Sequence, residues 1–100
     1  MKSSEQPFSR RVRAVVAAIP RGTVMTYAAV AKAAGAPRAH RAVGTIMAGN
    51  RDTLVPCHRV VRSDGTIGTY NGGGPDKKRE KLISEGVLVK TVRGIHYIAT

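Results

Sequence analysis

A pair of short helices separated by a tight link constrains the fold of this chain more than any other feature of its sequence. Residues 27–34 are rich in alanine, follow Thr26 as a good N-cap residue, and end at Gly35, which suits the left-handed position after a helix. Pro37 suits the first turn of a further helix that runs to Gly49. Two helices with so short a link, the second one basic, form the pattern of a helix-turn-helix, although many unrelated helical pairs also have short links.

Apolar spacing predicts the helical core around this pair. Ser9 can cap a first helix that ends at Pro20. The apolar positions of that helix recur at helical spacing at Val12, Val15, Val16 and Ile19. In the helix that runs to Gly49, the same spacing places four residues inward: Ala39, Val43, Ile46 and Met47.

The segment after these helices is rich in β-branched residues. Asp64-Gly65 is a strong hairpin signal and predicts that residues 59–62 and 66–69 pair as strands. Pro56 is expected to keep the residues that follow it out of the regular ladder.

The last third of the chain completes the predicted fold. A charged helix over residues 76–85 stops at Gly86, and the residues around Arg93-Gly94 can form a terminal hairpin. A chain of 100 residues has the size of one domain with one modest core. We therefore predict a single domain over residues 1–100 that is mostly α with small β hairpins and resembles a winged helix-turn-helix.

The charge of the chain is strongly positive and unevenly distributed. The formal net charge is +11, and the stretch from residue 10 to residue 62 holds one acidic residue, Asp52. Such a stretch repels itself unless a polyanion screens it, and nucleic acid is the common polyanion. The alternative, a soluble basic domain without a phosphate-binding face, is weaker. The same stretch holds ten basic residues: Arg10, Arg11, Arg13, Arg21, Lys32, Arg38, Arg41, Arg51, Arg59 and Arg62.

Other classes of protein are excluded by what the sequence lacks. No run approaches the roughly eighteen apolar residues of a membrane span, and the N-terminus has no apolar stretch typical of a secretory signal. We expect a monomer in the cytoplasm, associated with the nucleoid, or in the nucleus if the source is eukaryotic. The single cysteine cannot form an internal disulfide, and the three scattered histidines give no metal-ligand spacing, so we expect no metal.

Cys57 is the residue most able to carry chemistry. It lies between Pro56 and the pair His58-Arg59, and a cysteine attacks as its thiolate, which positive charge and an imidazole favour. An isolated cysteine is, however, most often a small buried hydrophobic residue. Neighbours in an extended segment also point to opposite sides, so His58 need not touch Cys57. These residues alone leave a nucleophile and an inert core residue equally open.

Five segments, in this order and spacing, closely resemble the C-terminal DNA-binding domain of O6-alkylguanine-DNA alkyltransferases. They are TYAAVAKAAG, RAVGTIMAGN, VPCHRVV, GTYNGG and SEGV, and the similarity covers roughly residues 8–86. The usual N-terminal domain of the family is absent from this sequence. The size is similar to that of the alkyltransferase-like proteins, which bind alkylated guanine without transfer. In those relatives the acceptor cysteine is typically replaced, often by tryptophan, whereas Cys57 is present here.

The resemblance implies a role for each residue of a reaction centre. Cys57 resembles the acceptor that takes the alkyl group from the O6 atom of a flipped guanine. His58 resembles the base that relays the thiol proton through a water, and Glu85 the carboxylate that orients it. Asn50 resembles the asparagine that braces the active-site turn. Tyr27 resembles the tyrosine that displaces a DNA phosphate and donates a proton to the departing guanine. No dissociable cofactor is implied, because the lesion is the donor.

The resemblance also implies a DNA-binding face and a pocket for the base. Arg41 resembles the arginine that enters the base stack where the nucleotide has left, and its helix resembles one that enters the minor groove. Asn71 stands where this loop of the family commonly has serine, and a third glycine makes the loop one residue longer. The other residues implied to contact DNA are Arg38, Ala39, Ala42 and Gly44. The residues implied to line or support the pocket are Val55, Pro56, Val60, Tyr70, Asn71 and Gly72.

Two functions from different classes follow. The first is a single-turnover methylated-DNA-[protein]-cysteine S-methyltransferase that repairs O6-alkylguanine in double-stranded DNA. The second is a non-catalytic module that binds the same lesion and signals to nucleotide excision repair proteins. A general basic DNA-binding domain with a buried cysteine would leave the context of Cys57 and Tyr27 unexplained. The retained cysteine favours the first function.

Overall fold

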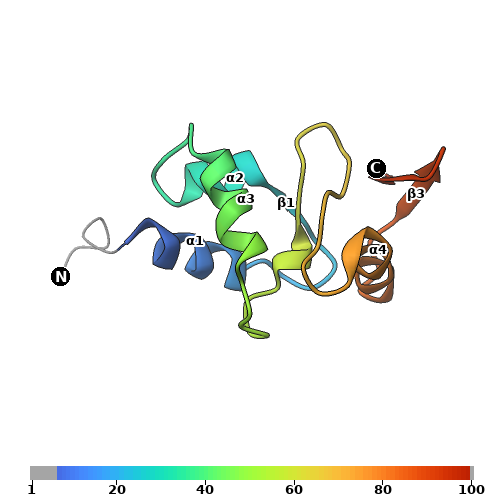
Figure 1. Ribbon diagram of the computed structural model, residues 1–100, viewed down its shortest axis with the longest axis horizontal. Coiled ribbons are helices and arrows are strands. Elements are labelled where there is room, and N and C mark those ends of the chain that lie inside the picture. The colour runs from blue at the N-terminus through green and yellow to red at the C-terminus, as the bar shows by residue number, and fades with distance from the viewer. Residues whose placement is uncertain (1–6, 100) are drawn as a thin grey trace.

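The computed structural model describes residues 7–99 and places three helices at one end of the molecule (Figure 1). These are α1 (Phe8–Ala17), α2 (Tyr27–Ala33) and α3 (His40–Ala48). They pack on a core in which Val12, Val16, Val30, Val43 and Met47 are buried. Ala39 and Ile46, also expected to face inward, are partly buried and pack against the same core.

The caps of these helices agree with the sequence at some positions and differ at others. The Thr26 side chain accepts a hydrogen bond of 3.0 Å from the Ala29 backbone N–H, and Gly35 has a φ of +91°, as predicted. Ser9 is not a cap, because α1 already begins at Phe8. Pro37 is not in α3, since the chain forms a turn in which the Ala39 N–H donates to the Ala36 carbonyl before α3 begins at His40.

A short parallel pair of strands joins the helices to the rest of the molecule. Strand β1 (Met25–Thr26) pairs with β2 (Val60–Val61), with Met25 opposite Val60. The hairpin predicted over residues 59–62 and 66–69 is therefore wrong, although the Arg62 N–H still donates to the Thr66 carbonyl across the turn. The physical reason is burial: successive side chains of β2 point to opposite sides, and each enters a different core cluster.

The second cluster lies under α4 (Gly74–Ser84) and contains Val61, Ile67, Leu82 and Val87. The helix begins two residues earlier than predicted, and Gly86 takes a left-handed φ of +91° after it. Strands β3 (Val89–Val92) and β4 (Ile95–Ile98) form the predicted terminal hairpin.

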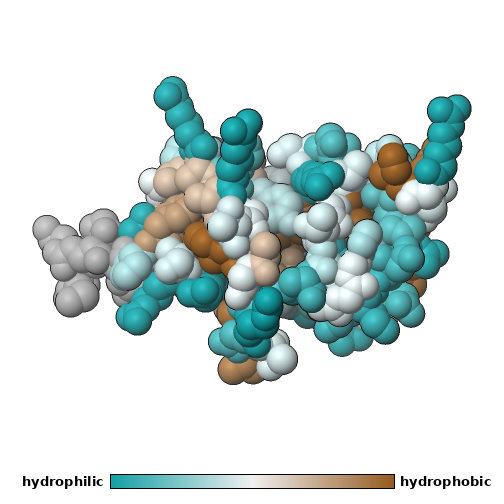
Figure 2. All heavy atoms as spheres, in the orientation of Figure 1, coloured by the Kyte–Doolittle hydropathy of each residue, from teal (hydrophilic) through white to brown (hydrophobic). Residues whose placement is uncertain are grey.

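The observed class is the predicted one: a mostly α, helix-turn-helix-like single domain with two small sheets, of which the β3–β4 hairpin is one. Hydrophilic side chains project from the surface over α2 and α3 and again over the hairpin end (Figure 2). Within residues 7–99, no helix is long and apolar enough to cross a membrane.

Candidate active site

Cys57 lies in a single turn of 3₁₀ helix, η2 (Cys57–Arg59), directly before β2. Pro56 precedes the turn and keeps it out of the ladder, as predicted. Because a 3₁₀ helix has about three residues per turn, consecutive side chains diverge by roughly a third of a circle rather than pointing to opposite sides. Cys57 and His58 therefore line the same hollow, which the expectation of an extended segment had made doubtful.

Two hollows meet at Cys57. The first hollow has a volume of about 240 Å³ and is lined by Cys57, His58 and all but one of the residues expected at the base pocket: Val55, Pro56, Tyr70, Asn71 and Gly72. The second hollow has a volume of about 220 Å³ and extends from Cys57 toward α3, with Tyr27, Gly44 and Met47 in its wall. Val60, the remaining residue, is fully buried in the core behind them. Cys57 is thus largely buried, at 9% exposed, and forms part of the wall of both hollows.

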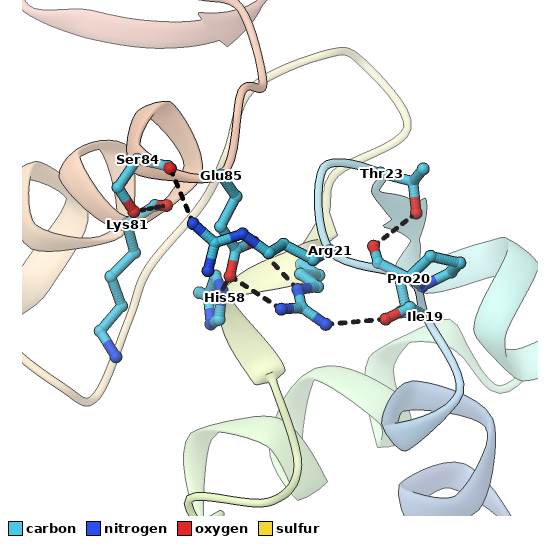
Figure 3. Close-up of polar contacts among 9 residues, drawn as sticks. Ile19, Pro20, Arg21, Thr23, His58, Lys81, Ser84 and Glu85 are labelled. Atoms are coloured by element: carbon cyan, nitrogen blue, oxygen red, sulfur yellow. Dashed lines mark hydrogen bonds and ion pairs between the residues drawn. The ribbon is translucent and has the colours of Figure 1, made fainter.

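A carboxylate from the end of α4 holds the histidine. The His58 Nε2 atom lies 3.0 Å from Glu85 Oε2, where η2 and the end of α4 meet (Figure 3). Burial lowers the pKa of His58, and the hydrogen bond with Glu85 only partly opposes this shift. His58 is therefore neutral at neutral pH, and Nδ1 carries the lone pair when Nε2–H donates to the carboxylate.

Arg59 completes this arrangement, and the sequence interpretation missed it. Its guanidinium donates to both oxygens of Glu85, at 2.9 and 2.8 Å, and to the Ile19 carbonyl at 2.8 Å. The hydrogen bond from Arg59 is the main reason that the pKa of Glu85 falls to about 2. The charge pattern of the sequence places Arg59 among the basic residues expected to face a polyanion. In the structure its guanidinium instead bonds to Glu85 and to the Ile19 carbonyl. Its place directly after His58 was the only signal in the sequence.

The turn after α1 approaches the backbone of Glu85 closely. A Cβ atom on Gly22, which has a φ of +88°, would lie 3.0 Å from the Glu85 carbonyl oxygen. The Arg21 guanidinium donates to the Ser84 carbonyl at 3.0 Å beside it (Figure 3). The end of α4, and with it Glu85, is thereby fixed against the α1–α3 core.

Lys78 is a second residue that the sequence interpretation missed. It is 1% exposed, and its Nζ atom donates to the carbonyls of Val60 at 2.8 Å and Thr69 at 3.1 Å. It also lies 5.8 Å from the ring centroid of Tyr27. Burial lowers the pKa of Lys78 to about 8, and negative charge at Cys57 opposes this shift. Its spacing of four from buried Leu82 was the available signal, on a helix that is otherwise polar.

Tyr27 begins α2 and lines the second hollow with its hydroxyl half-buried. Burial raises the pKa of Tyr27, and the positive charge of Arg62 acts in the opposite direction. The phenol therefore remains protonated at neutral pH and can serve as a proton donor.

Two asparagines hold the loops around Cys57. The Asn50 amide donates to the Val55 and Asp52 carbonyls, both at 3.2 Å, which closes the turn before Pro56. The Asn71 amide donates to the carbonyls of Ala48 at 2.8 Å and Asn50 at 2.7 Å. The Asn71 amide nitrogen is thus engaged by the end of α3, which ties the loop over the pocket to that helix.

The residues expected to contact DNA lie on and before α3. Arg38, Arg41 and Ala42 are exposed, whereas Ala39 and Gly44 are half-buried. None of them except Gly44 lines either hollow around Cys57. The Arg41 guanidinium has no hydrogen-bond partner among the residues that the structure describes. No group of three or more metal-ligating side chains is clustered within residues 7–99.

Comparisons with known proteins agree with this geometry. Residues 7–87 match the family described as 6-O-methylguanine DNA methyltransferase, DNA binding domain. A methylated-DNA--protein-cysteine methyltransferase of Methanothermobacter thermautotrophicus is 48% identical over 84 residues, which are 83% of this chain and 46% of the relative. A DNA base-flipping protein of Escherichia coli is 47% identical over 88 residues, which are 85% of this chain and 66% of the relative. This chain therefore spans only part of both relatives.

Solved structures give the same result. S. pombe Atl1 in complex with damaged DNA containing O6-carboxymethylguanine superposes with a TM-score of 0.82 at 33% identity, covering 100% of this chain and 93% of that one. Mycobacterium tuberculosis OGT in complex with DNA superposes with a TM-score of 0.76 at 38% identity, covering 81% of this chain and 49% of that one. Both proteins are bound to DNA in those structures.

Proposed function

The chain belongs to the family of 6-O-methylguanine DNA methyltransferase DNA-binding domains, and from that premise we propose that it repairs DNA by moving an alkyl group from O6 of guanine to Cys57. One observation carries the proposal. Cys57 opens onto two hollows beside a neutral histidine whose other ring nitrogen is held by a carboxylate. An inert core cysteine needs neither the hollows nor the oriented base.

The transfer step balances with these side chains and water. The thiol proton passes through a water to Nδ1 of His58, and the sulfur attacks the carbon attached to O6. The S–C bond forms as the C–O6 bond breaks, and the electron pair stays with guanine. Tyr27 gives its proton to the guanine ring, which makes the base a better leaving group. His58 then releases its extra proton to solvent, and Tyr27 recovers one from solvent. The thioether is inert, so each molecule acts once.

The DNA would reach this site along α3. The second hollow faces α3 and takes the flipped guanine beside Tyr70 and Asn71, so that the other residues expected at the base pocket, Val55, Pro56 and Gly72, line only the first hollow. The small residues Ala42 and Gly44 allow the helix to approach the minor groove. Exposed Arg38 and Arg41 lie on the same segment, where they meet phosphates and the gap in the base stack. The solved complexes of S. pombe Atl1 and M. tuberculosis OGT with DNA support DNA binding by a chain of this fold.

The test follows the lesion. Protein is mixed with a limiting duplex that contains O6-methylguanine, and the modified base is counted after digestion of the DNA. We expect one lesion to become guanine for each protein molecule, and Cys57→Ser to bind the duplex without converting any. Conversion by Cys57→Ser at the parent rate would refute the proposal.

Two comparisons favour a second function. S. pombe Atl1 is matched over the full length of this chain, and the E. coli relative is named as a base-flipping protein rather than a transferase. A lesion-binding module that presents alkylguanine to excision repair proteins would bind the duplex tightly and leave the lesion count unchanged. The same experiment therefore separates the two functions.

Arg41→Ala is expected to weaken base flipping more than binding. The variant lacks the guanidinium that fills the gap left by the flipped base, so we expect the rate of lesion conversion to fall about tenfold or more. The affinity for DNA should fall only by the contribution of one phosphate contact. The fluorescence of 2-aminopurine placed beside the lesion reports the unstacking. Lys90→Ala, which removes one exposed charge from β3, is the matched control. Equal conversion by Arg41→Ala and the parent would remove this assignment.

A further inference from the structure

We propose that Lys81, together with Arg51, makes this site prefer O6 substituents that end in a carboxylate over neutral substituents of the same shape. The inference rests on the proposed function and concerns the first hollow. Both residues line that hollow together with Cys57 and His58, and neither has a role in the transfer step proposed above.

The lining of the two hollows indicates that the first holds the substituent rather than the base. The wall of the second hollow includes residues of α3, from which DNA would approach, whereas the wall of the first includes residues 50–53 and Lys81 of α4; the two hollows share Cys57, Tyr70 and Asn71. When the sulfur attacks the carbon next to O6, any longer substituent must extend past the sulfur. A volume of about 240 Å³ greatly exceeds the space that a methyl group requires.

The charges around the first hollow favour an anion. Lys81 reaches the first hollow from α4, with its Nζ atom 5.9 Å from the ring centroid of Tyr70. The charge of Lys81 contributes to the lowered pKa of His58, after the larger effect of burial. Arg51 reaches it from the end of α3, where its guanidinium is held by the carbonyls of Ala48 at 3.3 Å and Asn50 at 3.2 Å. The one acidic residue in the wall, Asp52, is engaged with the Leu54 N–H at 2.9 Å. Two cations thus oppose one anion whose carboxylate already has a partner.

Lys81 is the better of the two cations to test. It is exposed, its Nζ atom makes no hydrogen bond or ion pair within residues 7–99, and it can therefore turn toward a substituent at little cost. Arg51 also braces the backbone, so replacing it would disturb the turn before Pro56 as well as the charge. Lys81→Met keeps an unbranched side chain of nearly the same length and removes the charged ammonium group.

The experiment compares two lesions that differ in charge alone. Duplexes carrying O6-carboxymethylguanine and its neutral amide, O6-carbamoylmethylguanine, are titrated with Cys57→Ser protein, so that binding is measured without transfer. We expect Cys57→Ser protein to bind the acid about three- to tenfold more tightly than the amide. Adding Lys81→Met to it should bring this ratio of affinities near one. Lys81→Arg should retain the preference. The general loss of DNA affinity cancels in the ratio.

Lys77→Met is the matched control, since Lys77 is an exposed lysine of the same helix that pairs with Glu80 outside the hollow. It should leave the ratio unchanged. An equal ratio for the parent and Lys81→Met would overturn the inference. Because the ratio is measured with Cys57→Ser, it is independent of whether Cys57 protein converts O6-methylguanine, and a failure of transfer is recognised separately.

Discussion

Glu85→Gln is expected to slow alkyl transfer by roughly a hundredfold, because the general base loses the carboxylate that orients it and raises its basicity. His58 Nε2 and the Arg59 guanidinium both bond to Glu85. The Oε2 atom of Glu85 accepts from His58 Nε2 and Arg59 Nη2, and Oε1 accepts from Arg59 Nε. A glutamine is uncharged and places an N–H₂ group, which cannot accept, at one of these two positions. The single-turnover rate of lesion conversion measures the effect.

The same change should destabilise the fold. The Glu85 and Arg59 side chains are 9% and 16% exposed, so the pair is largely shielded from water, and we expect a loss of about 2 kcal/mol in the free energy of unfolding. The pKa of Glu85 falls from 4.5 to about 2 on folding. The contribution is therefore complete above pH 4.5 and disappears as the pH falls through 2.

Glu80→Gln is the control for this prediction, since Glu80 is an exposed carboxylate of the same helix that lies 3.8 Å from Lys77. It should change neither the rate nor the stability by a measurable amount. A Glu85→Gln protein that transfers as fast as Glu80→Gln would show that His58 does not depend on the carboxylate.

Lys78→Met is expected to be the second severe substitution. The buried ammonium ties β2 to the loop of Thr69, and its loss leaves the Val60 and Thr69 carbonyls without that donor. We expect a loss of about 1–2 kcal/mol in the free energy of unfolding near pH 7, which is less than two orphaned carbonyls would cost because the burial of a charge is relieved. We also expect transfer to slow about tenfold, because a cation near Cys57 and Tyr27 is removed.

The pH dependence distinguishes this explanation from a simple packing defect. The pKa of Lys78 is lowered from 10.5 to about 8 on folding, so between these values the unfolded chain binds more protons than the folded one. The parent therefore gains stability from this group as the pH rises from 8 to 10.5. The difference in the free energy of unfolding between the parent and Lys78→Met should grow over that range. Denaturation at several pH values measures it, with Lys77→Met as the control. A deficit independent of pH would contradict the buried cation.

Local signals in the sequence predict the parts of the fold that depend on local chemistry. The Thr26 cap, the left-handed Gly35 and the turn at Arg93-Gly94 need only the residues around them, and the structure has all three. The predicted strand partner of β2 was wrong because the turn signal at Asp64-Gly65 is local. The pairing of β2 with β1 is decided by the burial of its two side chains in two core clusters, whose residues are distant in the sequence.

The site divides in the same way. The resemblance to alkyltransferases indicated Cys57, His58 and Glu85. In the structure Cys57 and His58 line the same hollow, and a hydrogen bond joins His58 to Glu85. Arg59 and Lys78 were missed because a sequence shows only that a residue is charged. Whether that charge faces DNA or a buried carbonyl depends on how η2 and α4 pack.

The mass of the intact protein is the most direct test of a nucleophilic Cys57. The protein is weighed before and after mixing with an equimolar duplex that contains O6-methylguanine. We predict a gain of one methyl group in place of one hydrogen, located on the peptide that contains Cys57 and absent in Cys57→Ser. An unchanged mass in protein that has bound the duplex would contradict it.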